Sequence, residues 1–126
     1  MQSRFSLDFA DAQAIAAACL ESAARQGVAV SIAIVDGAGD LLQFSRMDGA
    51  RTYTVDLATK KARAAANVGV ATAIIAAMSG PGAESVKAGG LPVLHQGQCV
   101  GAVGISGAQT AVDEAIATEG IAALGA

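Results

Sequence analysis

Short apolar runs with a turn signal between them occur twice along the chain. The runs occupy residues 28–35, 40–45, 91–94 and 99–103. The first two are joined by the sequence DGAG, and the last two flank Gln96-Gly97. A two-residue hairpin needs positive φ angles in its turn, which glycine adopts without a steric penalty. The pattern therefore predicts two β-hairpins, with the second at the centre of the fold.

Four longer segments have the period and the end signals of α-helices. They occupy residues 8–26, 53–67, 70–78 and 110–124. Asp8 is placed to cap the first helix, and Thr52 or Thr54 to cap the second, because a side-chain oxygen there accepts a bond from a free backbone N–H. In the last helix, the spacing predicts a buried side formed by Val112, Ile116, Ile121 and Leu124.

The order of these elements predicts the fold class. Because hairpin-linked strands alternate with helices, it favours an α+β sandwich in which helices pack on an antiparallel sheet of four or five strands. Residues 4–7 are predicted to add a short edge strand, and the residues 79–90, rich in glycine and proline, to form a mobile loop. With 53% hydrophobic residues among 126, one core is expected, so residues 1–126 are predicted to form a single domain.

Composition and charge narrow the class of partner. The net charge is −3 and the cationic clusters are short, whereas nucleic-acid-binding proteins usually carry a basic stripe, so no nucleic-acid partner is predicted. The sequence has no apolar signal region and no uncharged apolar run of about 18 residues, which predicts a cytoplasmic protein without membrane contact. Alanine-rich helices and a surplus of apolar residues indicate a homo-oligomer, in which some of this surface is buried.

Residues able to bind a metal are few and scattered. Cys19 and Cys99 lack the C-x-x-C spacing and lie in apolar segments, so both are predicted to be reduced core residues. His95 is the only histidine and cannot form a multi-histidine metal site, so no metal centre is predicted. Its place beside a turn is compatible with an axial ligand of a tetrapyrrole metal, a general acid or base, or an exposed hairpin residue.

Polar residues with possible chemistry lie at the ends of the predicted elements, where sites commonly occur. Asp36 begins the first turn, where its carboxylate either accepts backbone bonds or takes part in catalysis. Arg46 and Asp48 place a cation and an anion close together in the loop after the second strand. Asp113 lies in the first turn of the last helix, where the helix dipole alone explains an acidic residue.

Glycines mark a region of close approach in and around the second hairpin. Gly101, Gly104 and Gly107 recur at every third position, and Gly89-Gly90 precede the first strand of the hairpin. Because glycine has no Cβ, another backbone or a ligand can come near. The segment is therefore predicted to be either a crowded packing seam or the floor of a pocket.

Three segments carry a resemblance to a known family. They are VDGAGDLLQFSRMDGA, the helix containing KKARAAA, and GGLPVLHQGQCVGAVGISGAQTAVDEAIATEG. Together they resemble the GlcG/HbpS-like family, which also occurs as the C-terminal module of PduO-type proteins. The resemblance implies a profilin-like α+β sandwich that assembles into homo-oligomers. Some members of that family bind haem or are linked to corrinoid metabolism, and others belong to glycolate or aromatic catabolic pathways.

The resemblance also implies a set of candidate site residues. The polar residues that match the family's pattern are Asp36, Arg46, Asp48, Lys61, Ser106 and Asp113. Lys61 fills the lysine of the family's lysine-alanine position. His95 departs from the pattern, because an aliphatic residue is common there, so metal binding through His95 would be particular to this protein.

Three functional hypotheses follow, and the first is preferred. In the first, the protein binds a small ligand, either a tetrapyrrole (haem or a corrinoid) or a small carboxylic acid whose negative groups pair with its cations. The expected ligand-binding residues are Asp36, Arg46, Lys61, Gly89, Gly90, His95, Gly104 and Ser106. In the second, it is a cofactor-free isomerase, tautomerase or lyase that moves a proton on an unsaturated or hydroxylated carboxylic acid. The expected catalytic residues are Asp48, Asp113 and Lys61. A purely structural oligomeric protein is the third and least specific possibility.

Overall fold

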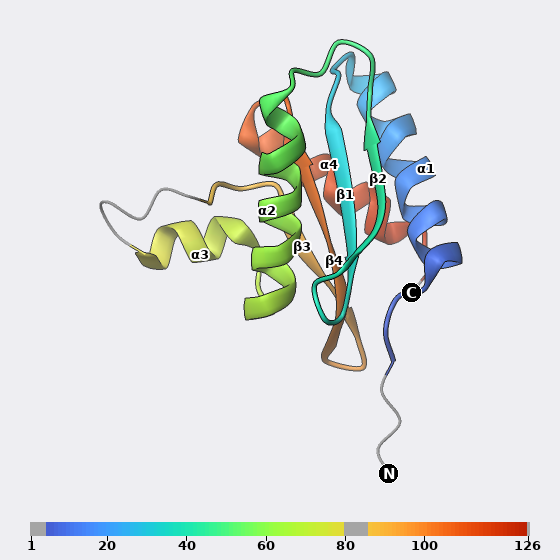
Figure 1. The fold of residues 1–126 in the computed structure, drawn as a ribbon, viewed down its shortest axis with the longest axis vertical. Helices are drawn as coiled ribbons and strands as arrows, with labels where there is room; N and C mark the ends of the chain where they lie inside the picture. The colour runs from blue at the N-terminus through green and yellow to red at the C-terminus, as the bar shows by residue number, and fades with distance from the viewer. Residues whose placement is uncertain (1–4, 80–85, 126) are drawn as a thin grey trace.

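The computed structural model describes residues 5–79 and 86–125, which form three layers (Figure 1). The middle layer is a four-stranded antiparallel sheet with the strand order β2-β1-β4-β3. Its strands are β1 (Ser31–Asp36), β2 (Leu41–Arg46), β3 (Gly90–His95) and β4 (Gln98–Ser106). One face packs against α1 (Phe9–Gln26) and α4 (Thr110–Ala122), and the other against α2 (Tyr53–Val68). The short α3 (Thr72–Ser79) projects from the α2 side. The predicted α+β class is confirmed.

Both predicted hairpins form, and their turn chemistry explains why. Gln96 and Gly97 have φ angles of 52° and 79°, the positive pair that a two-residue turn requires. In the other turn, Oδ1 of Asp36 accepts bonds from the backbone N–H groups of Ala38 and Asp40 at 2.9 and 3.0 Å. The turn-capping role considered for Asp36 is therefore present in the structure.

The predicted edge strand at residues 4–7 is not formed by the described residues 5–7, and residue 4 lies outside the described residues. A single backbone bond, from the N–H of Leu7 to the carbonyl oxygen of Val100 at 2.9 Å, ties this segment to β4. One bond does not make a ladder, so the sheet keeps four strands. Most of the predicted loop at 79–90, residues 80–85, also lies outside the described residues.

Helix capping follows the prediction for α1 but not for α2. Asp8 and Asp11 exchange side-chain bonds with each other's backbone N–H groups at 2.9 and 3.0 Å, which forms a capping box. Thr52 makes no capping bond, because its backbone is already helical rather than extended. The Thr54 hydroxyl instead lies 2.6 Å from the Arg51 carbonyl oxygen and 2.8 Å from Oγ of Ser31, which ties α2 to β1.

The two faces of the sheet have different cores. The face under α1 and α4 is built from larger side chains, including Ile32, Ile34 and Ile105, whereas the α2 face is built mainly from alanine. A Cβ atom at Gly104 would overlap the carbonyl oxygen of Ala58, so α2 lies directly on the backbone of β4. The prediction that elements approach closely is confirmed here, and Gly104 belongs to the packing seam.

The buried side of α4 differs from the predicted one. Among the four expected positions only Ile116 is fully buried, and Val112, Ile121 and Leu124 are half-buried. The reason is that α4 crosses α1 through Gly120, where an added Cβ would overlap Sγ of Cys19. Cys19 is a buried free thiol as predicted, and Cys99 is a half-buried free thiol. None of the helices in the described part of the chain is long and apolar enough to span a membrane.

Candidate functional site

A buried ion pair joins the two helical layers across the edge of the sheet. Nζ of Lys61 on α2 lies 3.2 Å from Oδ2 of Asp113 on α4, and the two side chains are only 5% and 2% exposed. The same ammonium group donates to the carbonyl oxygen of Ile105 at 2.7 Å. Charged groups are rarely buried this deeply unless they are paired, so this pair is the main electrostatic feature of the interior.

The sheet register creates the place that Lys61 occupies. Gly90 is the first residue of β3 and lies opposite Gly104, so β4 runs two residues beyond the start of β3. Ile105 still receives its N–H partner, the carbonyl oxygen of Gly89, at 2.9 Å. Its own carbonyl oxygen accepts the Lys61 ammonium group instead of a further strand partner. The lysine therefore supplies a hydrogen-bond donor to β4 at the point where β3 no longer pairs with it.

Gly89 and Gly90 make room for this arrangement. A Cβ atom on Gly89, which has a φ of 127°, would lie 2.8 Å from Nζ of Lys61 and 2.6 Å from the Ile105 carbonyl oxygen. A Cβ atom on Gly90 would lie 2.5 Å from the carbonyl oxygen of Lys61. Both glycines are thus required by the approach of α2 and its lysine, which gives them a positioning role beside the site.

Asp113 is held by two partners. Oδ1 accepts the backbone N–H of Ala108 at 3.0 Å, and Oδ2 accepts Lys61. Burial raises the pKa of the Asp113 carboxyl group, and the nearby Lys61 cation opposes this shift. Burial also lowers the pKa of the Lys61 ammonium group, and Asp113 opposes this shift in turn. Helix-dipole compensation alone does not explain Asp113, because that role requires no burial.

The ion pair lines a cavity of about 240 Å³ between α2, the end of β4 and the start of α4. Ser106, the last residue of β4, also lines it and is only 4% exposed. No residue in the described part of the chain hydrogen-bonds the Ser106 hydroxyl group. The rest of the lining consists of Tyr53, Leu57, Lys87, Gly107, Ala108 and Thr110. We call this space the Lys61 cavity.

The other polar residues predicted for a site lie elsewhere. Ser31 of β1 lies opposite Arg46 of β2 on one side and opposite Ser106 of β4 on the other. Arg46 and Ser106 are therefore separated by two strand spacings, or about 10 Å. It is exposed and donates to the carbonyl oxygen of Ala50 at 2.9 Å. Asp48 is exposed in the same loop, and Asp36 lies at the opposite end of β1. None of these three residues lines the Lys61 cavity.

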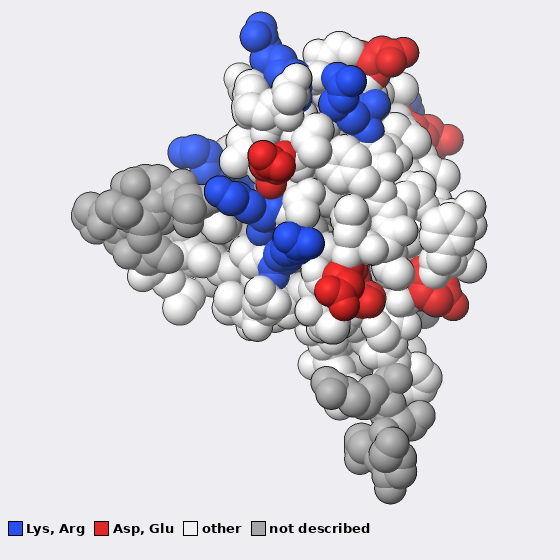
Figure 2. Space-filling view, in the orientation of Figure 1, with Lys and Arg blue, Asp and Glu red and all other residues white. Residues whose placement is uncertain are grey.

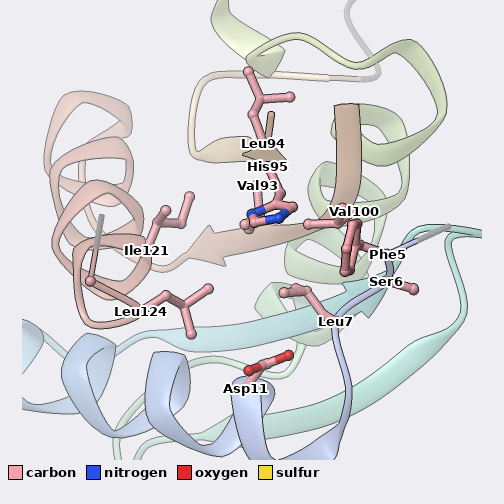
Figure 3. Close-up of a pocket in the computed structure, with 11 residues that line it drawn as sticks. Phe5, Ser6, Leu7, Asp11, Val93, Leu94, His95, Val100, Ile121 and Leu124 are labelled. Carbon is pink, nitrogen blue, oxygen red and sulfur yellow. The ribbon is translucent and has the colours of Figure 1, made fainter. Parts of the chain in front are cut away.

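His95 lines a different cavity, of about 420 Å³, on the other face of the sheet. Figure 3 shows its ring among side chains from the β3–β4 hairpin, the end of α4 and the segment before α1. Most of the lining is apolar, with Leu7, Val93 and Leu124 among it. The ring of Phe5 meets the imidazole edge-on, with centroids 4.8 Å apart. We call this space the His95 cavity.

The structure adds residues that no sequence signal identified. Lys87 precedes β3 and lines the Lys61 cavity, where its charge also contributes to the lowered pKa of Lys61. Thr72 positions this segment, because its hydroxyl donates to the carbonyl oxygen of Lys87 at 2.6 Å and accepts the N–H of Gly90 at 2.9 Å. Within the described ranges, no three His, Cys, Asp or Glu residues come together as a possible metal site.

Comparison with known sequences identifies related proteins. The sequence model of the family described as "Haem degrading protein HbpS-like" matches residues 7–122. Protein GlcG from Escherichia coli K12 is 38% identical over 104 residues, which are 75% of this chain and 77% of GlcG. These matches confirm the resemblance that the sequence motifs indicated.

Solved structures are similar over almost the whole chain. The crystal structure of Klebsiella pneumoniae protein ORFY has a TM-score of 0.93 at 30% identity, and the match covers 100% of this chain and 95% of that one. The crystal structure of a PduOC:heme complex has a TM-score of 0.87, also at 30% identity, with 94% and 95% covered. The fold is therefore one that has been observed with bound haem in a similar protein.

Proposed function

The chain belongs to the HbpS-like family of haem-degrading proteins, and from this premise we propose that it binds haem and that His95 would hold the iron. One observation carries the proposal, namely that the only histidine of the chain lines a cavity with mostly apolar walls. Neutral imidazole is a common axial ligand of haem iron. The PduOC:heme complex supports haem as the ligand class.

The His95 cavity fits the body of a macrocycle better than the Lys61 cavity does. Its volume of about 420 Å³ lies in the range of small-molecule sites, of roughly 300–1,000 Å³. Val93 and Val100 form its floor on the sheet, and Ile121 and Leu124 form a wall from the α4 side. The ring of Phe5, which now meets His95 edge-on, adds an aromatic surface against which a flat ligand can pack.

The charges around the His95 cavity indicate which part of the ligand it would hold. Asp11 is the charged residue among the described lining residues, and no lysine or arginine belongs to them. The two propionates of haem would be repelled by Asp11, so we expect them to point toward solvent. His95 is itself exposed, which allows the iron to be reached from outside. Bound haem would supply redox and oxygen chemistry that these side chains lack.

Titration of the purified protein with haemin tests the proposal. We expect a shifted and intensified Soret band that saturates at one equivalent per chain. His95→Ala should weaken binding at least about tenfold, because the metal bond is lost, and added imidazole should restore the spectrum. Gln98→Ala is the matched control, since Gln98 pairs with His95 across the hairpin but does not line the cavity. Titration with a cobalamin distinguishes a corrinoid from haem.

Two results would contradict this proposal. A wild-type protein without a Soret change at stoichiometric haemin does not bind haem. A His95→Ala spectrum equal to that of the wild type places the iron on another ligand. Because His95 is exposed, its replacement should leave the circular dichroism spectrum unchanged.

We also propose that the protein assembles into a homo-oligomer. The end of α2 and the short α3 expose the large apolar residues Val68, Ile74 and Met78, whose exposed fractions are 59%, 48% and 78%. α3 stands away from the body of the molecule (Figure 1). A second copy of the chain that covers this helix would remove the apolar surface from water.

A further inference from the structure

The geometry points to a second binding site, independent of haem: we propose that the Lys61 cavity binds a small organic acid through its carboxylate group. The Lys61 cavity and the His95 cavity share no lining residue. The Lys61 cavity lies at the end of β4, and the His95 cavity lies near the β3–β4 turn. Loss of one function therefore should not remove the other.

The charge balance of the Lys61 cavity favours a single negative group. Its charged lining residues are Lys61, Lys87 and Asp113, so the cations exceed the anions by one. On the face that carries α2, mostly basic side chains gather over that helix and the loop before it (Figure 2). An anion that enters would meet an attractive field, and a monoanion would neutralise the lining.

Two buried groups retain hydrogen-bonding capacity toward the cavity. An ammonium group has three N–H donors, and Lys61 directs one to Ile105 and one to Asp113. No described residue accepts the third. Ser106 is equally buried, and its hydroxyl group has no partner in the described part of the chain. Both groups line the cavity, so the free lysine donor and the Ser106 hydroxyl group are available to an acceptor that enters it.

The start of α4 adds backbone donors to the same cavity. Gln109 is the N-cap of this 13-residue helix and makes no side-chain capping bond, so the first N–H groups of the helix are not capped by it. Thr110, the first helical residue, lines the cavity. Helix N-termini attract anions through their free N–H groups and their dipole. Here the terminus acts together with the lysine and the serine.

The size and walls of the cavity identify the class of ligand. A volume of about 240 Å³ is below the usual range for drug-sized ligands, which starts at roughly 300 Å³. Leu57 and Ala108 provide an apolar wall, and the exposed Tyr53 and Lys87 lie at the mouth. The ligand is therefore a short monocarboxylic acid with a small, partly apolar body. Inorganic phosphate has no apolar part to contact Leu57 and Ala108. Its negative charge also exceeds the single net positive charge of the cavity lining.

Calorimetric titration with butyrate tests the inference, with the uncharged butyramide and inorganic phosphate as comparison ligands. We expect saturable binding of butyrate, weaker binding of phosphate and none of butyramide. Lys87→Gln should weaken butyrate binding by about tenfold, because a charge-assisted contact is lost. Lys60→Gln is the matched control, since Lys60 is an exposed cation of α2 that does not line the cavity. Ser106→Ala should weaken binding by roughly two- to tenfold.

Neither Lys87→Gln nor Ser106→Ala should impair folding. Lys87 is exposed, and the Ser106 hydroxyl has no partner to lose among the described residues. The inference is overturned if butyrate does not saturate at millimolar concentrations, if butyramide binds as well as butyrate, or if phosphate binds more tightly. Equal affinities of Lys87→Gln and Lys60→Gln would also overturn it. His95→Ala should bind butyrate like the wild type, and a loss in that variant would place the acid in the His95 cavity.

Discussion

Removing Lys61 tests the buried ion pair directly. Lys61→Met keeps much of the aliphatic stem but deletes the cation, which leaves the carboxylate of Asp113 buried with only the Ala108 N–H as partner. At the observed 3.2 Å and an effective dielectric constant of about 20, the lost attraction is about 5 kcal/mol. Part of it is offset because the lysine no longer has to be desolvated. We therefore expect a loss of about 3–5 kcal/mol in the free energy of unfolding.

Urea denaturation followed by far-UV circular dichroism measures this loss, at one protein concentration for all variants. Lys60→Met is the matched control, because the neighbouring lysine is exposed, and it should change stability by less than about 0.5 kcal/mol. The double variant Lys61→Met/Asp113→Leu removes both charges. It should be more stable than the sum of the two single changes predicts, by at least about 1 kcal/mol.

The pH dependence gives a second, independent readout. In Lys61→Met the pKa of Asp113, already raised by burial, rises further because its cation is gone. In the unfolded chain the carboxyl group of Asp113 ionises near pH 4, whereas in the folded state it keeps its proton to a higher pH. The free energy of unfolding therefore falls as the pH rises from about 4 through the pKa of Asp113 in the folded state. Acidification from pH 7 toward 5 should recover stability in Lys61→Met relative to Lys60→Met. A loss below about 1 kcal/mol, or identical pH profiles, would refute this account.

Three further predictions concern packing, thiols and assembly. Gly104→Ala should lower the free energy of unfolding, measured by urea denaturation, by about 3 kcal/mol or more, because the added Cβ would overlap the backbone of α2. Gly37→Ala is the control and should be tolerated, since a Cβ there would have contacts of 3.4 Å or more. Similar losses in the two variants would contradict the packing seam. At pH 8, only the thiol of Cys99 should react with Ellman's reagent in the folded protein. The thiol of Cys19 should not react, because burial raises its pKa to about 12. Rapid reaction of both thiols in the folded protein would contradict this prediction. Light scattering should show an oligomer that Met78→Ser weakens, and a monomeric wild type would exclude assembly through α3.

The parts of the fold that local chemistry decides could be predicted from the sequence. The turn at Gln96-Gly97 and the capping by Asp8 each depend on residues within three or four positions of one another. The Thr52 cap failed because the backbone of Thr52 is itself helical rather than extended, a conformation that the residue type does not determine. Local signals thus identified the elements, whereas the backbone conformation at their junctions depended on the surrounding fold.

The candidate site was harder to predict because its contacts are distant in sequence. Lys61 and Asp113 are 52 positions apart in the sequence. They meet only because β4 extends two residues beyond the first residue of β3, which leaves room for the lysine. The sequence showed Asp113 as an acidic residue near a helix start, for which the dipole was a sufficient explanation. Arg46 and Lys61 looked equivalent as cations, and only the sheet order separates them by two strands.

The lysine beside the start of β3 also covers the last residues of β4, which lack a partner in β3. β3 is an edge strand, and the carbonyl oxygen of Ile105 beyond its start is an acceptor that an incoming polypeptide would need for pairing. Lys61 occupies this acceptor, and its charge is paired with Asp113. A helix side chain thus satisfies the part of β4 that would otherwise be open to an incoming strand.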